Sequence, residues 1–264
     1  MTEFNPRDYW EKRLLASLES DGVGYSGLGK NYNDWLYKVR RHVFFRKTTM
    51  IFQYFENLRV LDVGCGNGFY IERWKDLGVR KVVGIDITEI AVKTLSRKFP
   101  SDEFYQLDIG SNEINQINNR KFDAISAFDV LFHIMDDARY EKAIINIYHL
   151  LNPDGLFLWS DNFLHDSPYR VTHQACRTLP FIESLLYKTG FEIVGRWPVF
   201  YFMNAPLDIS CRLHRYFWKL ITVLVSRYEN WSRIIGCFLY PIELIFINTV
   251  KEGPSTEFMI CRKR

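Results

Sequence analysis

The sequence predicts an α/β fold in which a parallel sheet is covered by helices on both faces. Short apolar runs alternate with segments of helical periodicity between residues 58 and 162, and strands that alternate with helices specify a parallel sheet. The first of these runs also ends in a glycine-rich turn that leads into a helix. The expected strands are 60–63, 81–87, 104–107, 122–128 and 156–159, and the expected helices include 88–98, with Thr88 as N-cap, and 138–151.

Length and composition permit a full hydrophobic core. The chain has 264 residues, 47% of them apolar, and a net charge of +3 without a dense basic run, so we expect no nucleic-acid partner. Five scattered cysteines without a Cys-x-x-Cys pair indicate a reduced, cytoplasmic protein. We expect no signal peptide, because the first residues lack a basic-then-apolar pattern, and no transmembrane segment, because no uncharged apolar run reaches about 18 residues.

Three glycines spaced two apart mark the turn after the first strand. Gly64, Gly66 and Gly68 let the backbone adopt positive φ and let a ligand approach main-chain amides. The turn therefore predicts a nucleotide site. The dinucleotide fingerprint requires glycine at the sixth position, where Phe69 stands, and the phosphate-binding loop requires a Gly-Lys-Ser/Thr ending, which is absent.

Acidic residues lie at the ends of the second, third and fourth expected strands. Asp86 is near the end of the second strand, Asp108 follows the third, and Asp129 follows the fourth. Ligands of parallel sheets lie at the carboxyl ends of the strands. A carboxylate there can accept the hydroxyls of a ribose or the amino protons of adenine. We therefore expect these side chains to contact the nucleotide.

The acidic strand residue Asp62, followed by Gly-x-Gly-x-Gly, resembles motif I of the class I S-adenosylmethionine (SAM) dependent methyltransferases. Residues 58 to 162 are similar to that family in the order and spacing of these features. The resemblance implies a Rossmann-like, mostly parallel sheet of seven strands with strand seven antiparallel. It also implies SAM as cofactor, with S-adenosylhomocysteine as product. The cofactor-binding residues that it implies are Asp62, Gly64, Cys65, Gly66, Gly68, Asp86, Ile87, Asp108, Ile109, Phe128 and Asp129.

Within this resemblance, Asp62 and the glycine turn are expected at the methionine end of SAM, Asp86 at the ribose and Asp108 at the adenine. Methyltransferases that act on amino groups of bases carry Asn/Asp-Pro-Pro-Tyr/Phe after strand four, and residues 128–131 lack both prolines. The segment is instead similar to the small-molecule methyltransferases of types 11 and 12. Base methylation is therefore disfavoured.

Histidines in the loops after strands four and five are candidates for a general base, because imidazole titrates near neutral pH. His133 and His165 are the candidate catalytic residues. His133 could equally pack beside the cofactor loop, and His165 could be an exposed loop residue whose acidic neighbours raise its pKa. His173 is expected to begin a helix that carries Arg177, and this pair is expected to bind substrate.

Asp129 could also belong to a metal site. Metal-dependent catechol-type O-methyltransferases place an aspartate after strand four and Asp-Asn after strand five, and Asp129, Asp161 and Asn162 occupy similar places. Oxygen ligands of this kind suit magnesium. That family also has a lysine three residues after the first aspartate, where Phe132 stands. We therefore expect no metal.

The sequence outside the core predicts a cap and an insertion. Residues 1–57 are expected to form a cap with helices at 7–18 and 34–57, the second capped by Asp34, and Tyr25 and Tyr32 of the cap are expected to bind substrate. Strands six and seven are expected at 190–197 and 256–261. The expected units are the cap at 1–57, the core at 58–206, a helical insertion at 207–250 and the last strand at 251–264.

The insertion is expected to form a basic amphipathic helix pair at 208–228 and 230–247. It could cover the acceptor pocket, form a dimer surface, contact an anionic membrane or simply pack as an extra layer. We expect a monomer or a homodimer.

Residues 22–29 and 35–37 resemble enzymes of polysaccharide and natural-product pathways. This resemblance implies an enzyme that methylates a hydroxyl of a small molecule or glycan in such a pathway. The alternatives are a metal-dependent catechol-type O-methyltransferase, an N-methyltransferase, a non-catalytic SAM-binding protein and a nicotinamide oxidoreductase.

Overall fold

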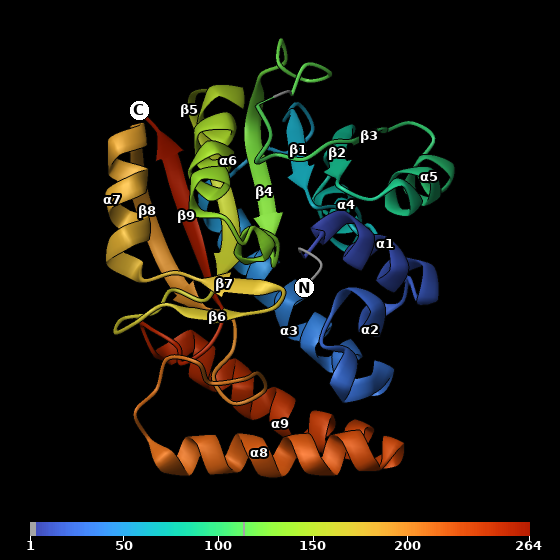
Figure 1. Ribbon diagram of the computed structural model, residues 1–264, viewed down its shortest axis with the longest axis vertical. Coiled ribbons are helices and arrows are strands. Elements are labelled where there is room, and N and C mark those ends of the chain that lie inside the picture. Colours follow the sequence, from blue (N-terminus) through green and yellow to red (C-terminus); the bar gives the residue numbers. More distant parts are fainter. Residues whose placement is uncertain (1–3, 113) are drawn as a thin grey trace.

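The computed structural model describes residues 4–112 and 114–264 (Figure 1). Its centre is a seven-stranded sheet with the order β3-β2-β1-β4-β5-β9-β8. The strands are β1 (Val60–Val63), β2 (Val82–Asp86), β3 (Glu103–Gln106), β4 (Phe122–Phe128), β5 (Leu151–Asp161), β8 (Phe191–Pro198) and β9 (Glu257–Lys263). β1 to β5 are parallel, and β9 is antiparallel to both of its neighbours. The predicted Rossmann-like fold is confirmed.

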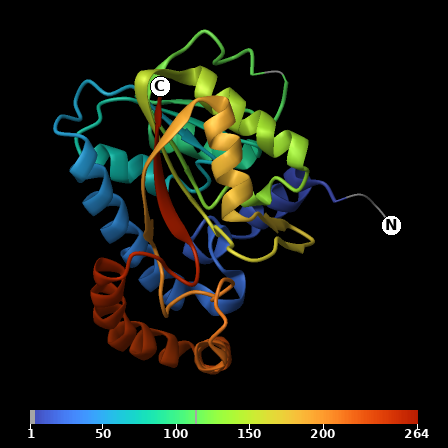
Figure 2. The same cartoon turned by 90° about the vertical axis from the view of Figure 1, so that its left-hand side faces the viewer.

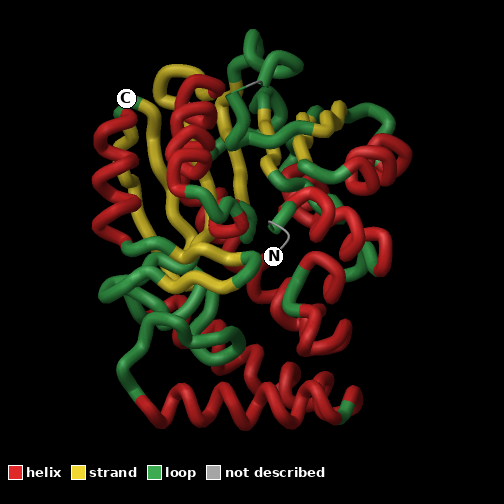
Figure 3. The backbone as a smooth tube through the Cα atoms, in the orientation of Figure 1, coloured by secondary structure: helices red, strands yellow, loops and turns green. Residues whose placement is uncertain are grey.

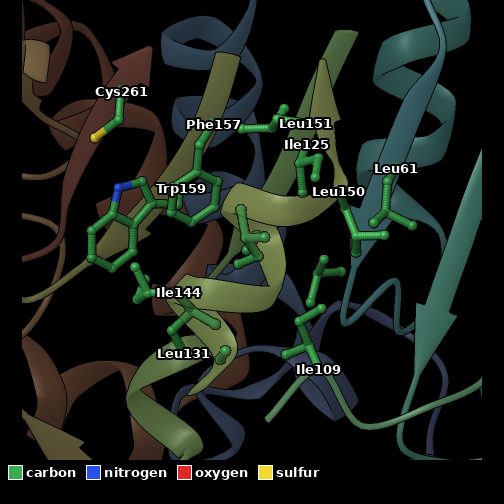
Figure 4. Packing of buried hydrophobic residues seen from close by; sticks show 14 of the residues in the cluster. Leu61, Ile109, Ile125, Leu131, Ile144, Leu150, Leu151, Phe157, Trp159 and Cys261 are labelled. Atoms are coloured by element: carbon green, nitrogen blue, oxygen red, sulfur yellow. The ribbon is translucent and has the colours of Figure 1, made fainter. Parts of the chain in front are cut away.

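Helices cover both faces of the sheet (Figure 1, Figure 2). Side chains of α6 (Asp137–Leu150) and α7 (Leu179–Thr189) pack on one face, and those of α3 (Gly29–Ile51), α4 (Phe69–Asp76) and α5 (Glu89–Lys98) pack on the other. Strand residues alternate between the two layers because successive side chains point to opposite faces. Leu61, Ile125 and Phe157 belong to the α6 side (Figure 4), whereas Val60 and Ala124 belong to the α3 side.

Two predicted elements have the wrong bounds. β5 begins at Leu151 and not at 156, with a register shift against β4. α3 spans Gly29–Ile51 and not 34–57, so Asp34 lies inside the helix and does not cap it. Asp34 instead accepts a hydrogen bond from the Ser20 hydroxyl at 2.6 Å.

The expected helix at His173 is a β-hairpin (Figure 3). β6 (Tyr169–Val171) pairs antiparallel with β7 (Gln174–Cys176), His173 lies in the connecting turn, and Arg177 follows β7. The β-branched and aromatic residues of β6 favour a strand over a helix.

The N-terminal segment forms α1 (Pro6–Ala16), the short α2 (Ser20–Val23) and a 3₁₀ turn, η1 (Ser26–Leu28). The Asn5 side chain accepts hydrogen bonds from the amides of Arg7 and Asp8 and so caps α1, and Pro6 occupies the first turn, where it has no amide to leave unpaired. The predicted helix at 7–18 is thus close to the observed one.

The chain between β8 and β9 forms α8 (Arg212–Arg227) and α9 (Glu229–Thr249). This helical pair lies beyond the carboxyl ends of the parallel strands (Figure 1). Glu243 of α9 is fully buried and accepts hydrogen bonds from the amides of Tyr201 at 2.6 Å and Phe202 at 2.8 Å. Burial raises the pKa of the Glu243 carboxyl to about 7. Glu243 therefore joins the insertion to the loop after β8.

One helix among the described residues, α9, is long and apolar enough over residues 230–249 to cross a membrane by length and composition alone. That property is weak evidence of a membrane span. The buried hydrogen bonds of Glu243 hold α9 against the protein instead.

We predict that Glu243→Ala lowers the free energy of unfolding by about 2–4 kcal/mol, because two buried amides lose their acceptor. Urea denaturation measures this change. Ile245→Ala on the same helix is the control: Ile245 is 62% exposed, so we expect a change within about 0.5 kcal/mol. Equal effects of the two substitutions would contradict the anchoring role.

Candidate functional site

A cavity of about 610 Å³ lies at the carboxyl ends of β1, β2 and β4. This volume is within the range of about 300–1,000 Å³ found for small-molecule sites. The glycine turn and the segments after β2, β3 and β4 line the cavity, and α1 covers it. Nine of the eleven predicted cofactor residues line it: Gly64, Cys65, Gly66, Asp86, Ile87, Asp108, Ile109, Phe128 and Asp129.

Asp86 joins the turns after β1 and β2. Its Oδ2 accepts the Gly66 amide at 2.9 Å, and its Oδ1 accepts the Thr88 amide at 2.9 Å and hydroxyl at 2.7 Å. Burial raises the pKa of Asp86, and these hydrogen bonds oppose that rise. Each carboxylate oxygen has two acceptor sites, so Oδ2 retains one for a ligand hydroxyl.

The glycine turn depends on backbone geometry that other residues avoid. Gly64, Gly66 and Gly68 all have positive φ, of 67°, 49° and 83°. A Cβ at Gly64 would lie 2.4 Å from Cγ2 of Val130, and a Cβ at Gly68 would lie 2.6 Å from Cδ2 of Leu95. Gly68 does not line the cavity, so its role is to let α5 pack against the turn.

Asp62 does not line the cavity either, which does not support the predicted contact with the methionine end of SAM. Its side chain lies on the α4 side of the sheet, where it accepts a hydrogen bond from the Ser126 hydroxyl at 2.6 Å. Ser126 in turn accepts from the Trp74 indole at 3.0 Å. Burial raises the pKa of Asp62 to about 7. Asp62 of β1 is thus joined to β4 and, through Ser126, to α4.

Asp108 and Asp129 both line the cavity and both pair with arginines that the sequence did not indicate. Asp108 forms an ion pair with Arg139 of α6 and accepts the Gly110 amide at 2.8 Å. Asp129 accepts from Nε of Arg40, on α3, at 2.7 Å. Its φ of 58° is rare for a residue other than glycine and marks a constrained backbone.

The residues of the alternative metal site do not converge. Asp129 pairs with Arg40, whereas Asn162 accepts a hydrogen bond from the Thr256 hydroxyl at 3.1 Å, and neither Asp161 nor Asn162 lines the cavity. No group of three or more His, Cys, Asp or Glu side chains in residues 4–112 and 114–264 could hold a metal ion. The geometry therefore does not support the metal-dependent alternative.

Aromatic rings form one wall of the cavity. Tyr70 stacks on Phe128 with ring centroids 4.2 Å apart, and Tyr37 of α3 contacts Phe69 edge-on at 4.6 Å. Burial raises the pKa of Tyr37 to about 12, so its phenol is neutral. Trp10 of α1 completes the wall. Aromatic faces attract cationic groups, so this wall suits a positively charged ligand atom.

His133 lies in the cavity at the end of the 3₁₀ turn η2 (Leu131–His133). Its Nδ1 is 2.7 Å from the carbonyl oxygen of His173. A carbonyl can only accept, so Nδ1 carries the proton and Nε2 keeps a lone pair. Burial lowers the pKa of His133 to about 4, partly because Trp10 lies over the ring, with centroids 4.7 Å apart. The side chain is therefore a neutral imidazole near pH 7.

His165, the second catalytic candidate, does not line the cavity. It is in the loop after β5 and pairs with the Asp208 carboxylate, which raises the pKa of His165. Its position does not support a role as the base. His173 also lies outside the cavity lining; its backbone orients His133, and its ring stacks on Tyr9 at 5.3 Å.

The other predicted substrate residues are structural. Tyr32 is fully buried and donates to the Met203 carbonyl at 3.2 Å. Tyr25 packs edge-on against Trp218 of α8. Arg177 is 3% exposed and forms an ion pair with Asp137. None of the three lines the cavity, so the structure does not support substrate contacts by Tyr25, Tyr32 or Arg177.

The cap is held over the cavity by side chains of α1. The Glu11 carboxylate accepts the amides of Glu89 at 2.8 Å and Ile90 at 3.1 Å, so it caps the start of α5. Arg13 donates to the Gly22 carbonyl at 2.7 Å and fixes the segment after α1. These contacts place Trp10 and Leu14 against the cavity.

Comparison with known proteins agrees with this arrangement. Residues 60–155 match the family model described as a methyltransferase domain. A protein of Geobacillus sp. (strain WCH70) named "Putative methyltransferase" is 30% identical over 215 residues, which cover 75% of this chain and 79% of the relative. A ubiquinone biosynthesis O-methyltransferase of Neisseria meningitidis serogroup C (strain 053442) is 29% identical over 39% of this chain.

The chain spans 43% of the length of that O-methyltransferase and less than half of the length of several other curated relatives that it matches. Among solved structures, a SAM-dependent methyltransferase from Archaeoglobus fulgidus is similar, with a TM-score of 0.52 at 18% identity. The similarity covers 84% of this chain and 94% of that chain. At this level of identity it supports the fold alone.

We predict that Gly64→Ala weakens SAM binding at least about tenfold, because the added Cβ must displace Val130 at the cavity wall. Gly29→Ala is the matched control. Gly29 also has positive φ, 68°, with ψ of 171°, but nothing lies within 4 Å of an added Cβ. We therefore expect only backbone strain, of about 1–3 kcal/mol in stability. Calorimetric titration with SAM compares the two; equal SAM affinities would contradict the close approach at Gly64.

We further predict that His133 and His165 differ in charge at pH 6.5. Burial lowers the pKa of His133 to about 4, whereas Asp208 raises that of His165, so His133 is neutral with the proton on Nδ1 and His165 is mainly protonated. Nitrogen-15 NMR of the imidazole rings distinguishes these states. A protonated His133 at that pH would contradict its burial.

Proposed function

Because the chain belongs to the family of SAM-dependent methyltransferases, we propose that it transfers a methyl group to a hydroxyl of a small molecule or glycan, with His133 as general base. The observation that carries this proposal is the position of His133. Among the described residues that line the cavity, His133 is the one histidine. Its Nδ1 donates to the His173 carbonyl, so Nε2 can accept a proton.

The residues of the cavity fit SAM. The remaining acceptor site on Asp86 suits a ribose hydroxyl, Asp108 and Ile109 suit the adenine, and the aromatic wall suits a sulfonium. When bound, SAM supplies the electrophilic methyl group. The protein's own contribution is to exclude water with α1, to align the acceptor and to take its proton.

Proton removal is assigned to Nε2 of His133. At pH 7 an imidazole with a pKa of about 4 is almost entirely in its basic form. It holds a proton only weakly, so uptake from the acceptor hydroxyl would accompany methyl transfer, and the proton would then return to water. Asp129 does not compete for this role, because its carboxylate is paired with Arg40.

The choice of acceptor rests on two supports. The relative from Neisseria meningitidis is named as an O-methyltransferase of ubiquinone biosynthesis, and the net charge of +3 without a dense basic run gives no electrostatic footprint for a nucleic acid. Other relatives are named as a tRNA U34 carboxymethyltransferase and an mRNA cap guanine-N(7) methyltransferase, so the acceptor must be tested directly.

We also propose a cytoplasmic, biosynthetic enzyme made of a cap (1–57), a core (58–206), an insertion (207–250) and a last strand (251–264).

An amine on a small molecule is the second candidate acceptor. The aromatic wall formed by Trp10, Tyr37, Phe69 and Tyr70 favours it, because aromatic faces attract cationic groups. An ammonium has no lone pair, so such an amine would first lose a proton to water and then attack the methyl group as the free base.

The first experiment is a screen with methyl-labelled SAM over phenolics, nucleotide sugars, glycans and amines. Label on a phenolic, sugar or glycan hydroxyl supports the proposal. Label confined to amines favours the second candidate. Label on none of these compounds would overturn the proposed methyl transfer. Calorimetric binding of NADH in place of SAM would also overturn it.

With an acceptor in hand, we predict that His133→Gln lowers kcat by about 10²–10⁴-fold, the usual contribution of a general base, while SAM affinity stays close to that of the wild type. His165→Gln is the matched control, because His165 lies outside the cavity lining, and it should retain wild-type kcat. Full activity of His133→Gln would show that His133 is a packing residue.

A further inference from the structure

The insertion presents an apolar surface that the described chain does not cover. The exposed apolar residues of α8 and α9 are spaced by three or four positions, so they form one stripe along each helix. We call these residues the apolar stripes: Leu213, Tyr216, Leu220 and Val223 on α8, and Trp231, Ile234, Phe238, Ile242 and Ile245 on α9.

Packing on the opposite sides of both helices fixes the direction of the stripes. Ile221 and Val225 of α8 and Ile247 of α9 are buried in the core on the α3 side of the sheet. Leu213 is 77% exposed and Phe238 is 72% exposed, although both are large apolar side chains. Within the apolar stretch 230–249 of α9, only 22% is buried in the protein. Both stripes therefore face away from the core.

Positive charge accompanies the stripes. Five basic residues lie on the two helices, and the acidic residues there are Glu229 and the fully buried Glu243. On α8, Arg215 and Lys219 are exposed and lie one turn apart next to the stripe. The basic residues are Arg212, Arg215, Lys219, Arg227 and Arg233.

We propose that the apolar stripes dock the protein on the surface of an anionic lipid membrane, with α8 and α9 in the plane of the interface. An apolar face beside lysine and arginine is the pattern of interfacial helices, in which apolar side chains enter the acyl boundary and cations contact lipid phosphates. Tyr216 and Trp231 are of the type that lies at headgroup depth.

Two other occupants fit the surface less well. A second copy of the chain would bring the same patch against itself, because two-fold contacts are isologous. The interface would then bring two positively charged patches together, and like charges repel. A transmembrane path for α9 would break the buried hydrogen bonds of Glu243 to the amides of Tyr201 and Phe202.

The surface lies at the same end of the molecule as the cavity. Both are found beyond the carboxyl ends of the parallel strands (Figure 1, Figure 2). Trp218 of α8 contacts Tyr25, which lies between α2 and η1 in the cap, with ring centroids 6.4 Å apart. Docking would therefore place the cavity close to the membrane, whatever acceptor it takes.

The test is flotation of the full chain with vesicles of phosphatidylcholine alone or of an equal mixture of phosphatidylcholine and phosphatidylglycerol. We expect binding to the mixed vesicles, weakened by salt because charges at the interface are screened. Lys219→Glu with Leu220→Ser should lower the partition coefficient at least about tenfold, since it reverses one cation and removes one apolar contact. Arg233→Glu with Phe238→Ser on α9 should act similarly.

The matched control is Tyr187→Ser with Lys188→Glu on α7. Tyr187 is 81% exposed and Lys188 is exposed, but they lie away from the insertion, so binding should be unchanged. Calorimetric SAM binding checks that every variant is folded. Absence of wild-type binding to mixed vesicles, or equal loss in the control, would overturn the proposal. A dimer in light scattering that Lys219→Glu with Leu220→Ser dissociates, without vesicle binding, would assign the surface to self-association.

Discussion

The site depends on the carboxylate of Asp86. It accepts the amide of Gly66 and two groups of Thr88, so it holds the turn after β1 and the turn after β2 in one arrangement. A buried carboxylate is costly unless hydrogen bonds compensate it, and here two of the three donors are backbone amides of the turns that line the cavity. The same side chain retains an acceptor site for SAM. Stability of the turn and recognition of the cofactor therefore rest on one group.

The protonation state of His133 depends on α1, which covers the cavity. Glu11 caps α5 and holds α1 across the strand ends, which brings Trp10 over His133. The resulting burial lowers the pKa of His133 and keeps it in its basic form. Aromatic rings around the cavity also attract a cationic sulfonium electrostatically.

Much of the fold and the part of the cavity at the strand ends could be predicted from sequence, because alternation and strand ends are local patterns. Asp86 and Gly64 lie at the cavity because carboxyl ends of parallel strands converge. Tyr37 and Trp10 could not be assigned, since they reach the cavity through the tertiary packing of α3 and α1. Tyr32 and Arg177 have chemically versatile side chains, yet tertiary contacts place both in the core.

The most direct test of the central claim is a crystal structure of the protein with S-adenosylhomocysteine. The account predicts the adenosyl group in the cavity beneath α1, a ribose hydroxyl within hydrogen-bonding distance of Oδ2 of Asp86, and the sulfur on the side of His133. A ligand bound outside this cavity, or a ribose without contact to Asp86, would contradict it.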